Sequence, residues 1–215
     1  MGAMHVAELW VYPVKSLAGQ RLERAELTVD GIPGDRRVQV RDGDDRLVTA
    51  RTRHRLLGLR ATLGEGGEAL VDGRPWSAPA SLTAVREVVA DDAARLVEVD
   101  GPARFDDTTL LVSTDGAVAA LGVDGRRLRP NIVIGGVEGL AERGWPGRSL
   151  RVGEAVIDVE KVCTRCVMTT IDPDTFGVSP QVLRRINDEF DGRFALNCWV
   201  ARAGTVAVGD RVELL

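Results

Sequence analysis

Cysteine is scarce in this chain, with three residues in 215. Such an odd and sparse set excludes a disulfide-stabilised scaffold and favours a reducing compartment. No apolar run approaches the roughly 18 residues that a transmembrane helix needs, and residues 1–10 lack the basic and apolar regions of a signal peptide. We therefore expect a cytoplasmic protein with no membrane partner, whose native start is Met4 after vector-derived residues.

Lysine is scarcer still. Lys15 and Lys161 are the two lysines, and the other 26 basic residues are arginine. Acidic residues number 32, so the formal net charge is −4, which excludes an overall electrostatic preference for nucleic acid or anionic membranes. A length of 215 residues corresponds to one large domain or two small ones, and it can bury a core without metal or disulfide.

The first half of the chain contains a succession of short β-type runs. Alternating apolar and polar residues, bounded by turns rich in glycine, proline and aspartate, predict strands and hairpins. The expected strands cover residues 6–12, 22–29, 37–41, 46–49, 59–63, 69–71 and 85–89, with a loop over residues 13–19. An ambiguous acidic stretch follows over residues 91–107, and we place a domain boundary there, near residue 95.

The second half predicts further strands and two helices. Ser113, Thr114 and Asp115 offer N-cap chemistry for a helix over residues 116–121. Another helix begins with Ser179 at the N-cap and Pro180 at the first helical position, followed by apolar residues at helical spacing. Strands are expected over residues 110–113, 129–135, 149–153, 155–162, 195–201 and 206–215. The expected fold is mainly β and barrel-like, with two or three helices.

The pair Cys163 and Cys166 has the two-residue spacing shared by zinc knuckles and dithiol redox motifs. Three cysteines exclude a four-cysteine iron–sulfur cluster within one chain, and the other soft donors are far apart in the sequence. The pair follows a strand and precedes another β-type run at residues 167–171, whereas a redox dithiol sits at a helix N-terminus. Buried cysteines without function remain an alternative. Another is one thiolate on a single soft metal or cofactor, which the neighbouring guanidinium of Arg165 would stabilise.

Several residues at turns and strand ends are candidate anion binders. Arginine binds phosphate bidentately, lysine binds it as a point charge, and a helix N-terminus offers free N–H groups. For each residue alone, a solvated surface role is the alternative, because spacing does not show that the residues converge. The sequence contains neither GxxxxGK[ST] nor GxGxxG after a strand. The candidates are Lys15, Ser16, Arg36, Ser113, Thr114, Arg129 and Asn131.

The segment Asp172-Pro-Asp-Thr175 carries two carboxylates two residues apart. A general acid and base pair is conceivable at this spacing. A proline-fixed turn, in which aspartate side chains accept hydrogen bonds from the backbone, is the favoured interpretation.

The sequence motifs of this chain, taken in order, resemble those of the MOSC superfamily, which is named for the C-terminal domain of molybdenum-cofactor sulfurase. The likeness is closer to the branch with an N-terminal β-barrel domain, which includes the mitochondrial amidoxime-reducing component and bacterial relatives. The motifs that carry the resemblance are Trp10-Val-Tyr-Pro-Val-Lys-Ser16, Gly34-Asp-Arg36, Arg129-Pro-Asn-Ile-Val-Ile134, Cys163-Thr-Arg-Cys166 followed by Thr169-Thr-Ile-Asp-Pro-Asp-Thr175, and Val208-Gly-Asp-Arg-Val212.

The resemblance implies a MOSC β-barrel over residues 96–215, a smaller N-terminal β-barrel-like domain over residues 4–95, and a molybdenum pterin cofactor between them. Cys166 matches the family's molybdenum ligand, and a thiolate suits a soft metal site. Asn131 and Arg165 would orient cofactor or substrate. The residues that would hold the cofactor are Lys15, Ser16, Arg36, Ser113, Thr114, Arg129, Asn131, Thr164 and Arg165.

The implied activity is reduction of N-hydroxylated small molecules such as amidoximes and hydroxylamines. Electrons would come from a separate donor protein of the ferredoxin, flavin reductase or cytochrome type. The alternatives are a cofactor carrier or sulfur-transfer module that uses Cys166, and a scaffold that binds no cofactor. Phe176 interrupts the Thr-Gly step usual in relatives, and residues 177–193 form a shorter segment than in the mitochondrial enzymes, so the substrate pocket is expected to differ.

Overall fold

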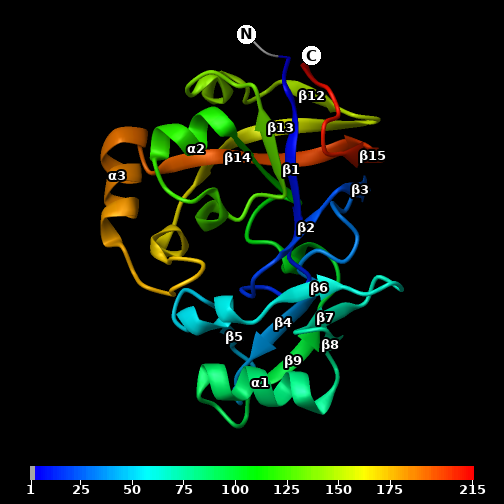
Figure 1. Ribbon diagram of the computed structural model, residues 1–215, viewed down its shortest axis with the longest axis vertical. Coiled ribbons are helices and arrows are strands. Elements are labelled where there is room, and N and C mark those ends of the chain that lie inside the picture. Colours follow the sequence, from blue (N-terminus) through cyan, green and yellow to red (C-terminus); the bar gives the residue numbers. More distant parts are fainter. Residues whose placement is uncertain (1–2) are drawn as a thin grey trace.

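The computed structural model describes residues 3–215, so residues 1 and 2, where the expected vector-derived start begins, lie outside the described part. The chain forms an upper body around one large sheet and a lower body of smaller sheets (Figure 1). The expected fold class, mainly β with two or three helices, is confirmed, and residues 3–215 contain three α-helices. Within residues 3–215, no helix is long and apolar enough to cross a membrane.

The upper body is an eight-stranded mixed sheet. Its order runs from β16 through β12, β13, β14, β10, β11 and β1 to β2. Most neighbours are antiparallel, and β10 with β11 is a parallel pair. The strands are β16 (Val212–Leu214), β12 (Ser149–Val152), β13 (Ala155–Thr164), β14 (Arg193–Arg202), β10 (Leu110–Thr114), β11 (Ile132–Gly135), β1 (His5–Val11) and β2 (Gln20–Leu22).

The first strand of the chain lies inside this sheet. β1 pairs with β11 on one side and β2 on the other, and β3 (Arg24–Leu27) pairs with β15 (Gly204–Ala207). Apolar side chains of the first 32 residues therefore share a core with the second half of the chain. The start of β1 and the C-terminus lie at the same end of the molecule (Figure 1).

The lower body contains two three-stranded sheets and a helix. β4 (Val38–Arg41) pairs with β5 (Leu47–Val48) and β9 (Arg95–Glu98), and β7 (Ala69–Val71) pairs with β6 (Ala61–Leu63) and β8 (Arg74–Pro75). The two expected hairpins are present, at β4–β5 and β6–β7. The expected division at residue 95 stays a prediction.

The strand predicted over residues 85–89 is wrong, because these residues end helix α1 (Pro79–Val89). Pro79 occupies the first turn, where a missing N–H costs nothing. Ser81, Val85 and Val89 follow at intervals of four and are all buried, which is the period of a helix face. The short apolar run is compatible with a strand or a helix, and the helical residues 79–84 before it extend the helix through residue 89.

The remaining helices cover one side of the large sheet (Figure 1). α2 (Asp115–Leu121) begins at Thr114, whose Oγ1 accepts a hydrogen bond from the Ala117 N–H at 3.0 Å. α3 (Pro180–Phe190) begins where it was predicted, and it buries Val182, Ile186 and Phe190. Short 3-10 helices connect the strands: η1 (His54–Gly58), η2 (Pro102–Arg104), η3 (Gly125–Leu128), η4 (Ala141–Gly144) and η5 (Val167–Thr170).

Candidate functional site

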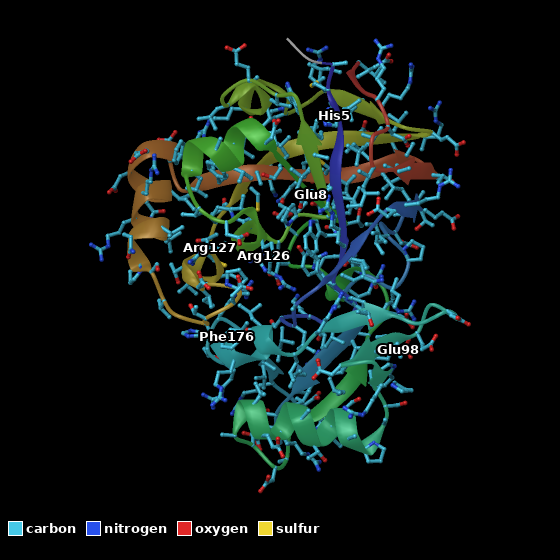
Figure 2. The ribbon with its side chains drawn as sticks, viewed as in Figure 1. His5, Glu8, Glu98, Arg126, Arg127 and Phe176 are labelled. Atoms are coloured by element: carbon cyan, nitrogen blue, oxygen red, sulfur yellow. The ribbon has the colours of Figure 1, made fainter. Side chains whose placement is uncertain are left out.

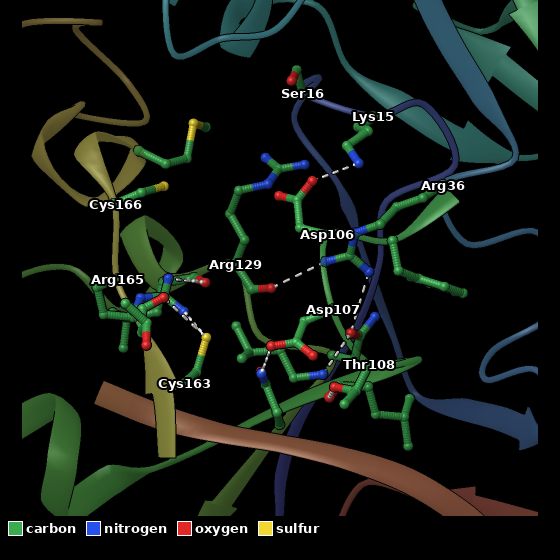
Figure 3. Close-up of a pocket in the computed structure, with 18 of the residues that line it drawn as sticks. Lys15, Ser16, Arg36, Asp106, Asp107, Thr108, Arg129, Cys163, Arg165 and Cys166 are labelled. Atoms are coloured by element: carbon green, nitrogen blue, oxygen red, sulfur yellow. Dashed lines mark hydrogen bonds and ion pairs between the residues drawn. The ribbon is translucent and has the colours of Figure 1, made fainter. Parts of the chain in front are cut away.

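A cavity of about 260 Å³ lies between the two bodies (Figure 3). In that view Cys163 and Cys166 lie on one side, Lys15, Ser16 and Arg36 lie on the other, and Arg129 stands between them. The predicted site residues that line it are Lys15, Ser16, Arg36, Arg129, Asn131, Thr164, Arg165 and Cys166. The chain thus brings together residues from the loop after β1, the turn before β4, the segment before β11 and the end of β13.

Ser113 and Thr114 are the two predicted site residues that do not line this cavity. Both are fully buried at the end of β10. The Thr114 hydroxyl caps α2 and donates to Glu142 Oε2 at 3.3 Å, so its hydrogen bonds are used within the fold. Helix α2 therefore begins where it was predicted, and its N-cap hydroxyl makes its hydrogen bonds inside the upper body.

The cationic side of the cavity is built around Asp106. The Lys15 ammonium lies 2.8 Å from Asp106 Oδ1 and also donates to the Arg104 carbonyl at 3.1 Å. The Arg51 guanidinium pairs with the other carboxylate oxygen. Partial burial acts to raise the pKa of Asp106, but the hydrogen bond and charge of Lys15, with the charges of Arg51 and Arg36, bring it below its usual value. Asp106 is therefore ionised at neutral pH and holds two cations at the cavity.

Arg129 brings a partly buried positive charge to the cavity. Its guanidinium carbon lies 4.2 Å from the centroid of the Tyr12 ring, and that of Arg36 lies 5.0 Å from the same ring. Within residues 3–215, no carboxylate pairs with Arg129. Removal from water and the nearby Arg36 lower the pKa of Arg129 to about 10, while burial raises the pKa of the Tyr12 hydroxyl to about 12. An anion entering here would find a cation without a partner.

Three of the cavity residues hold strained backbone conformations. Ser16, Arg36 and Arg129 have φ of 73°, 55° and 57°, in the left-handed region that residues with a Cβ seldom adopt. Each such residue costs free energy and persists only where surrounding contacts enforce it. All three were candidate anion binders from sequence alone, so strain coincides with the predicted site.

Asp35 and Asn131 form the buried base of the site. Asp35 Oδ1 accepts from the Tyr12 N–H at 2.8 Å, and Asp35 Oδ2 accepts from Asn131 Nδ2 at 3.1 Å and pairs with Arg36. Asn131 Oδ1 accepts from the Leu111 N–H at 3.1 Å. Both side chains are fully buried. Asn131 thus ties the cationic turn to the large sheet, a role that its position in the sequence did not indicate.

The cysteine side of the cavity follows β13. Cys166 is exposed and is the residue before η5, whereas Cys163 is half-buried and Cys198 is buried in the core. Arg165 donates to Cys163 Sγ at 3.4 Å and to the Leu128 carbonyl at 2.8 Å, and its buried Nε has no partner within the described residues. Arg51 lines the same cavity as Cys166, which sequence order did not reveal. Burial acts to lower the pKa of Arg51, but Asp106 and the nearby Cys166 raise it above its usual value.

The β-type run predicted over residues 167–171 is wrong, because these residues form η5. Two threonine hydroxyls donate to carbonyls three residues earlier: Thr169 to Cys166 at 2.9 Å and Thr170 to Val167 at 2.7 Å. Such local bonds compete with sheet pairing. The tight turn leaves the Cys166 side chain facing the cavity.

The turn at Asp172 is confirmed. Asp172 Oδ1 accepts from the N–H groups of Thr175 at 2.9 Å and Asp174 at 3.1 Å, and Oδ2 pairs with Arg127 at 2.7 Å. These backbone hydrogen bonds, that of Thr175 first, lower the pKa of Asp172 to about 2. The carboxylate caps a turn and does not line the cavity.

The arrangement suits an elongated anionic ligand with a soft metal at one end. A thiol on one side can bind the metal, and cations on the other side can bind a phosphate. Within residues 3–215, no three His, Cys, Asp or Glu side chains form a metal-binding cluster, and the soft donors that line the cavity are the thiols of Cys163 and Cys166 together with Met168.

Two family models together match nearly the whole chain: the MOSC N-terminal beta barrel domain over residues 3–109 and the MOSC domain over residues 110–213. The mitochondrial amidoxime-reducing component 1 of Mus musculus is 28% identical over 285 residues, covering 98% of this chain and 82% of the relative. The Homo sapiens protein of the same name is 26% identical over 230 residues, covering 79% of this chain and 67% of the relative.

A molybdenum cofactor sulfurase of Bombyx mori is 33% identical over 84 residues, which cover 39% of this chain and 10% of the relative. Among solved structures, the YUAD protein from Bacillus subtilis is similar in fold, with a TM-score of 0.50 and 14% identity over 99% of this chain and 96% of that one. The resemblance inferred from the motifs is confirmed. The chain belongs to the MOSC family and carries the MOSC N-terminal β-barrel domain before its MOSC domain.

Proposed function

We propose that this protein binds a molybdenum pyranopterin cofactor and reduces N-hydroxylated small molecules with electrons from a separate donor protein. One observation carries the proposal: an exposed thiol, Cys166, faces a cationic wall that includes Lys15 and Arg36 across one cavity. The similarity to amidoxime-reducing components supports the reaction class.

The residues present fit such a cofactor. The Arg129 guanidinium lacks a carboxylate partner and Arg165 Nε lacks any partner within the described residues, so both have hydrogen-bonding capacity to offer. Cys166 would ligate the metal, Lys15, Ser16 and Arg36 would hold the phosphate, and Arg129, Asn131, Thr164 and Arg165 would position the pterin. When bound, the cofactor supplies the two-electron chemistry on the N–O bond.

The chain's own groups impose one condition on binding. The Asp106 carboxylate already forms an ion pair with the Lys15 ammonium. A phosphate that binds Lys15 must therefore displace this carboxylate or share the ammonium with it. Because Asp106 stays ionised at neutral pH, it does not serve as a proton donor there, and its role is to hold Lys15 and Arg51 at the cavity. Arg51 in turn places positive charge near the Cys166 thiol.

The test measures molybdenum by elemental mass spectrometry on protein made in a cofactor-competent host. Wild type should hold about one metal per chain, and Cys166→Ser should lose it because a serine hydroxyl is a poor soft-metal ligand. Cys163→Ser is the matched control, since it alters the same motif without removing the proposed ligand, and it should keep the metal. Retention in Cys166→Ser would remove the ligand role.

Turnover separates the enzyme from a carrier. Loaded protein should consume benzamidoxime with an artificial electron donor, giving benzamidine and water. Molybdenum bound through Cys166 without turnover would favour the cofactor carrier or sulfur-transfer module, for which an exposed thiol is equally suited. Wild type without molybdenum from a competent host would reject the cofactor assignment.

A further inference from the structure

A second cavity, of about 470 Å³, adjoins the first, and of the residues proposed to hold the cofactor it includes Arg129 alone. Arg129 and Met168 line both cavities. Figure 2 shows Phe176 where the segment before α3 meets the lower body, with Arg126 and Arg127 above it. The volume lies within the range of small-molecule sites, about 300 to 1,000 Å³.

The lining of this cavity carries uncompensated positive charge. Five arginines line it, and two are neutralised: Arg126 by Asp124 and Asp174, and Arg127 by Asp172. Within residues 3–215, no carboxylate pairs with the other three, which are Arg21, Arg60 and Arg129. Arginine side chains without a carboxylate partner around one cavity favour an anionic ligand.

Flat aromatic surfaces line the same space. The Trp10 and Tyr12 rings are nearly parallel, at 15°, with centroids 6.5 Å apart. Phe176, in the segment before α3, also lines the cavity and has a φ of 61°, a strained conformation for a bulky residue. Its ring sits against Gly58, where an added Cβ would lie 2.9 Å from Phe176 Cζ. Strained residues gather at ligand sites.

We propose that this second cavity binds a small planar anion, an aromatic or heteroaromatic carboxylate. The ring would lie between Trp10 and Phe176, because aromatic side chains contact flat apolar groups well. The carboxylate would be attracted by the unpaired arginines. This inference does not rest on the molybdenum cofactor, because every residue that carries it belongs to the chain itself.

The test is isothermal titration calorimetry with 2-naphthoate and its neutral analogue 2-naphthamide, on wild-type protein at low ionic strength. The carboxylate should bind about tenfold more tightly than the amide, because a charge-assisted contact exceeds a neutral one. Added salt should weaken the binding of the carboxylate and leave the amide little changed. Equal binding of the two probes, or no binding of either, would overturn the proposal.

Variants locate the probe. Arg60→Gln should weaken 2-naphthoate about threefold, as expected for one exposed charge. Arg74→Gln removes an exposed charge that lines neither cavity and should change nothing. Phe176→Asn keeps a residue that tolerates positive φ while removing the ring, so it should weaken both probes. Equal effects of Arg60→Gln and Arg74→Gln would place the probe elsewhere and reject the site.

Cofactor-loaded protein distinguishes this site from the first cavity. Unchanged 2-naphthoate binding after loading supports a separate site. Binding that disappears on loading would mean that the cofactor itself occupies the cavity, and the proposal would fall. Absence of molybdenum with normal 2-naphthoate binding would reject the proposed function alone.

Discussion

The buried carboxylate of Asp35 holds together the base of the candidate site. It accepts from the Tyr12 N–H and from Asn131 Nδ2, and it pairs with Arg36. Asp35→Ala would leave those donors buried without an acceptor and Arg36 without its counterion. We expect the free energy of unfolding to fall by about 3 kcal/mol, as found when one partner of a buried pair is removed. Urea unfolding followed by circular dichroism measures the change.

Asp44→Ala is the matched control for that prediction. Asp44 also pairs with an arginine, Arg46, but both side chains are well exposed. Such surface pairs contribute little, so the change should stay within about 0.5 kcal/mol. Similar losses in the two variants would show that Asp35 has no special role.

At this scale, residue type was predictable and spatial proximity was not. Lys15, Arg36 and Arg129 were candidate anion binders because of their turns and neighbours, and the structure places them at one cavity. Arg51 escaped notice because its proximity to Cys166 depends on how the two bodies pack. Ser113 was also a candidate, and the structure places it in the core at the end of its strand, away from this cavity.

At the scale of elements, the turn at Asp172 makes a pH-dependent contribution. The folded pKa of about 2 lies below the unfolded value of about 3.9. The contribution is therefore fully present above the unfolded value and is lost as pH falls through the folded one. Thermal unfolding of wild type and Asp172→Asn should differ most at neutral pH and converge between pH 4 and pH 2. A constant difference across that range would contradict the assignment.

Elements with strong local signals were predicted, and short apolar runs were not. The Ser179-Pro180 start and the spacing of Val182 and Ile186 identified α3. Residues 85–89 and 167–171 are rich in the β-branched residues valine, threonine and isoleucine, which favour strands in isolation. The earlier turns of α1 decide the first case, and local hydrogen bonds of the Thr169 and Thr170 hydroxyls decide the second.

At the scale of the whole molecule, the sequence could not reveal that the chain's first strands complete the sheet of its second half. Pairing of β1 with β11 joins segments more than a hundred residues apart, and no local pattern encodes that distance. The expected division at residue 95 rests on composition alone. Because residues 6–32 share a hydrophobic core with the second half of the chain, this division can be tested with fragments.

A fragment of residues 96–215 should not fold. It would lose the strands that pair with β11 and β15 and a group of buried side chains worth about 10 kcal/mol in total, as much as the stability of a typical domain. The side chains lost from the large core are Val6, Leu9, Val11, Ala25, Leu27 and Ile32. Two-dimensional NMR spectra of the fragment should show the poor dispersion of an unfolded chain. Dispersed peaks would establish residues 96–215 as an independent domain.

The informative control keeps those first strands and removes the lower body instead. Arg104 Nη1 donates to the Asp35 carbonyl at 3.2 Å, so the chain enters and leaves the lower body at neighbouring points. Residues 4–35 joined to residues 103–215 by a short glycine–serine linker retain β1, β2 and β3. This chain should fold, with dispersed NMR peaks and a cooperative thermal transition, because the large sheet and its core remain complete. If it is unfolded while the longer protein folds, the two bodies stabilise each other, and neither is a domain in the thermodynamic sense.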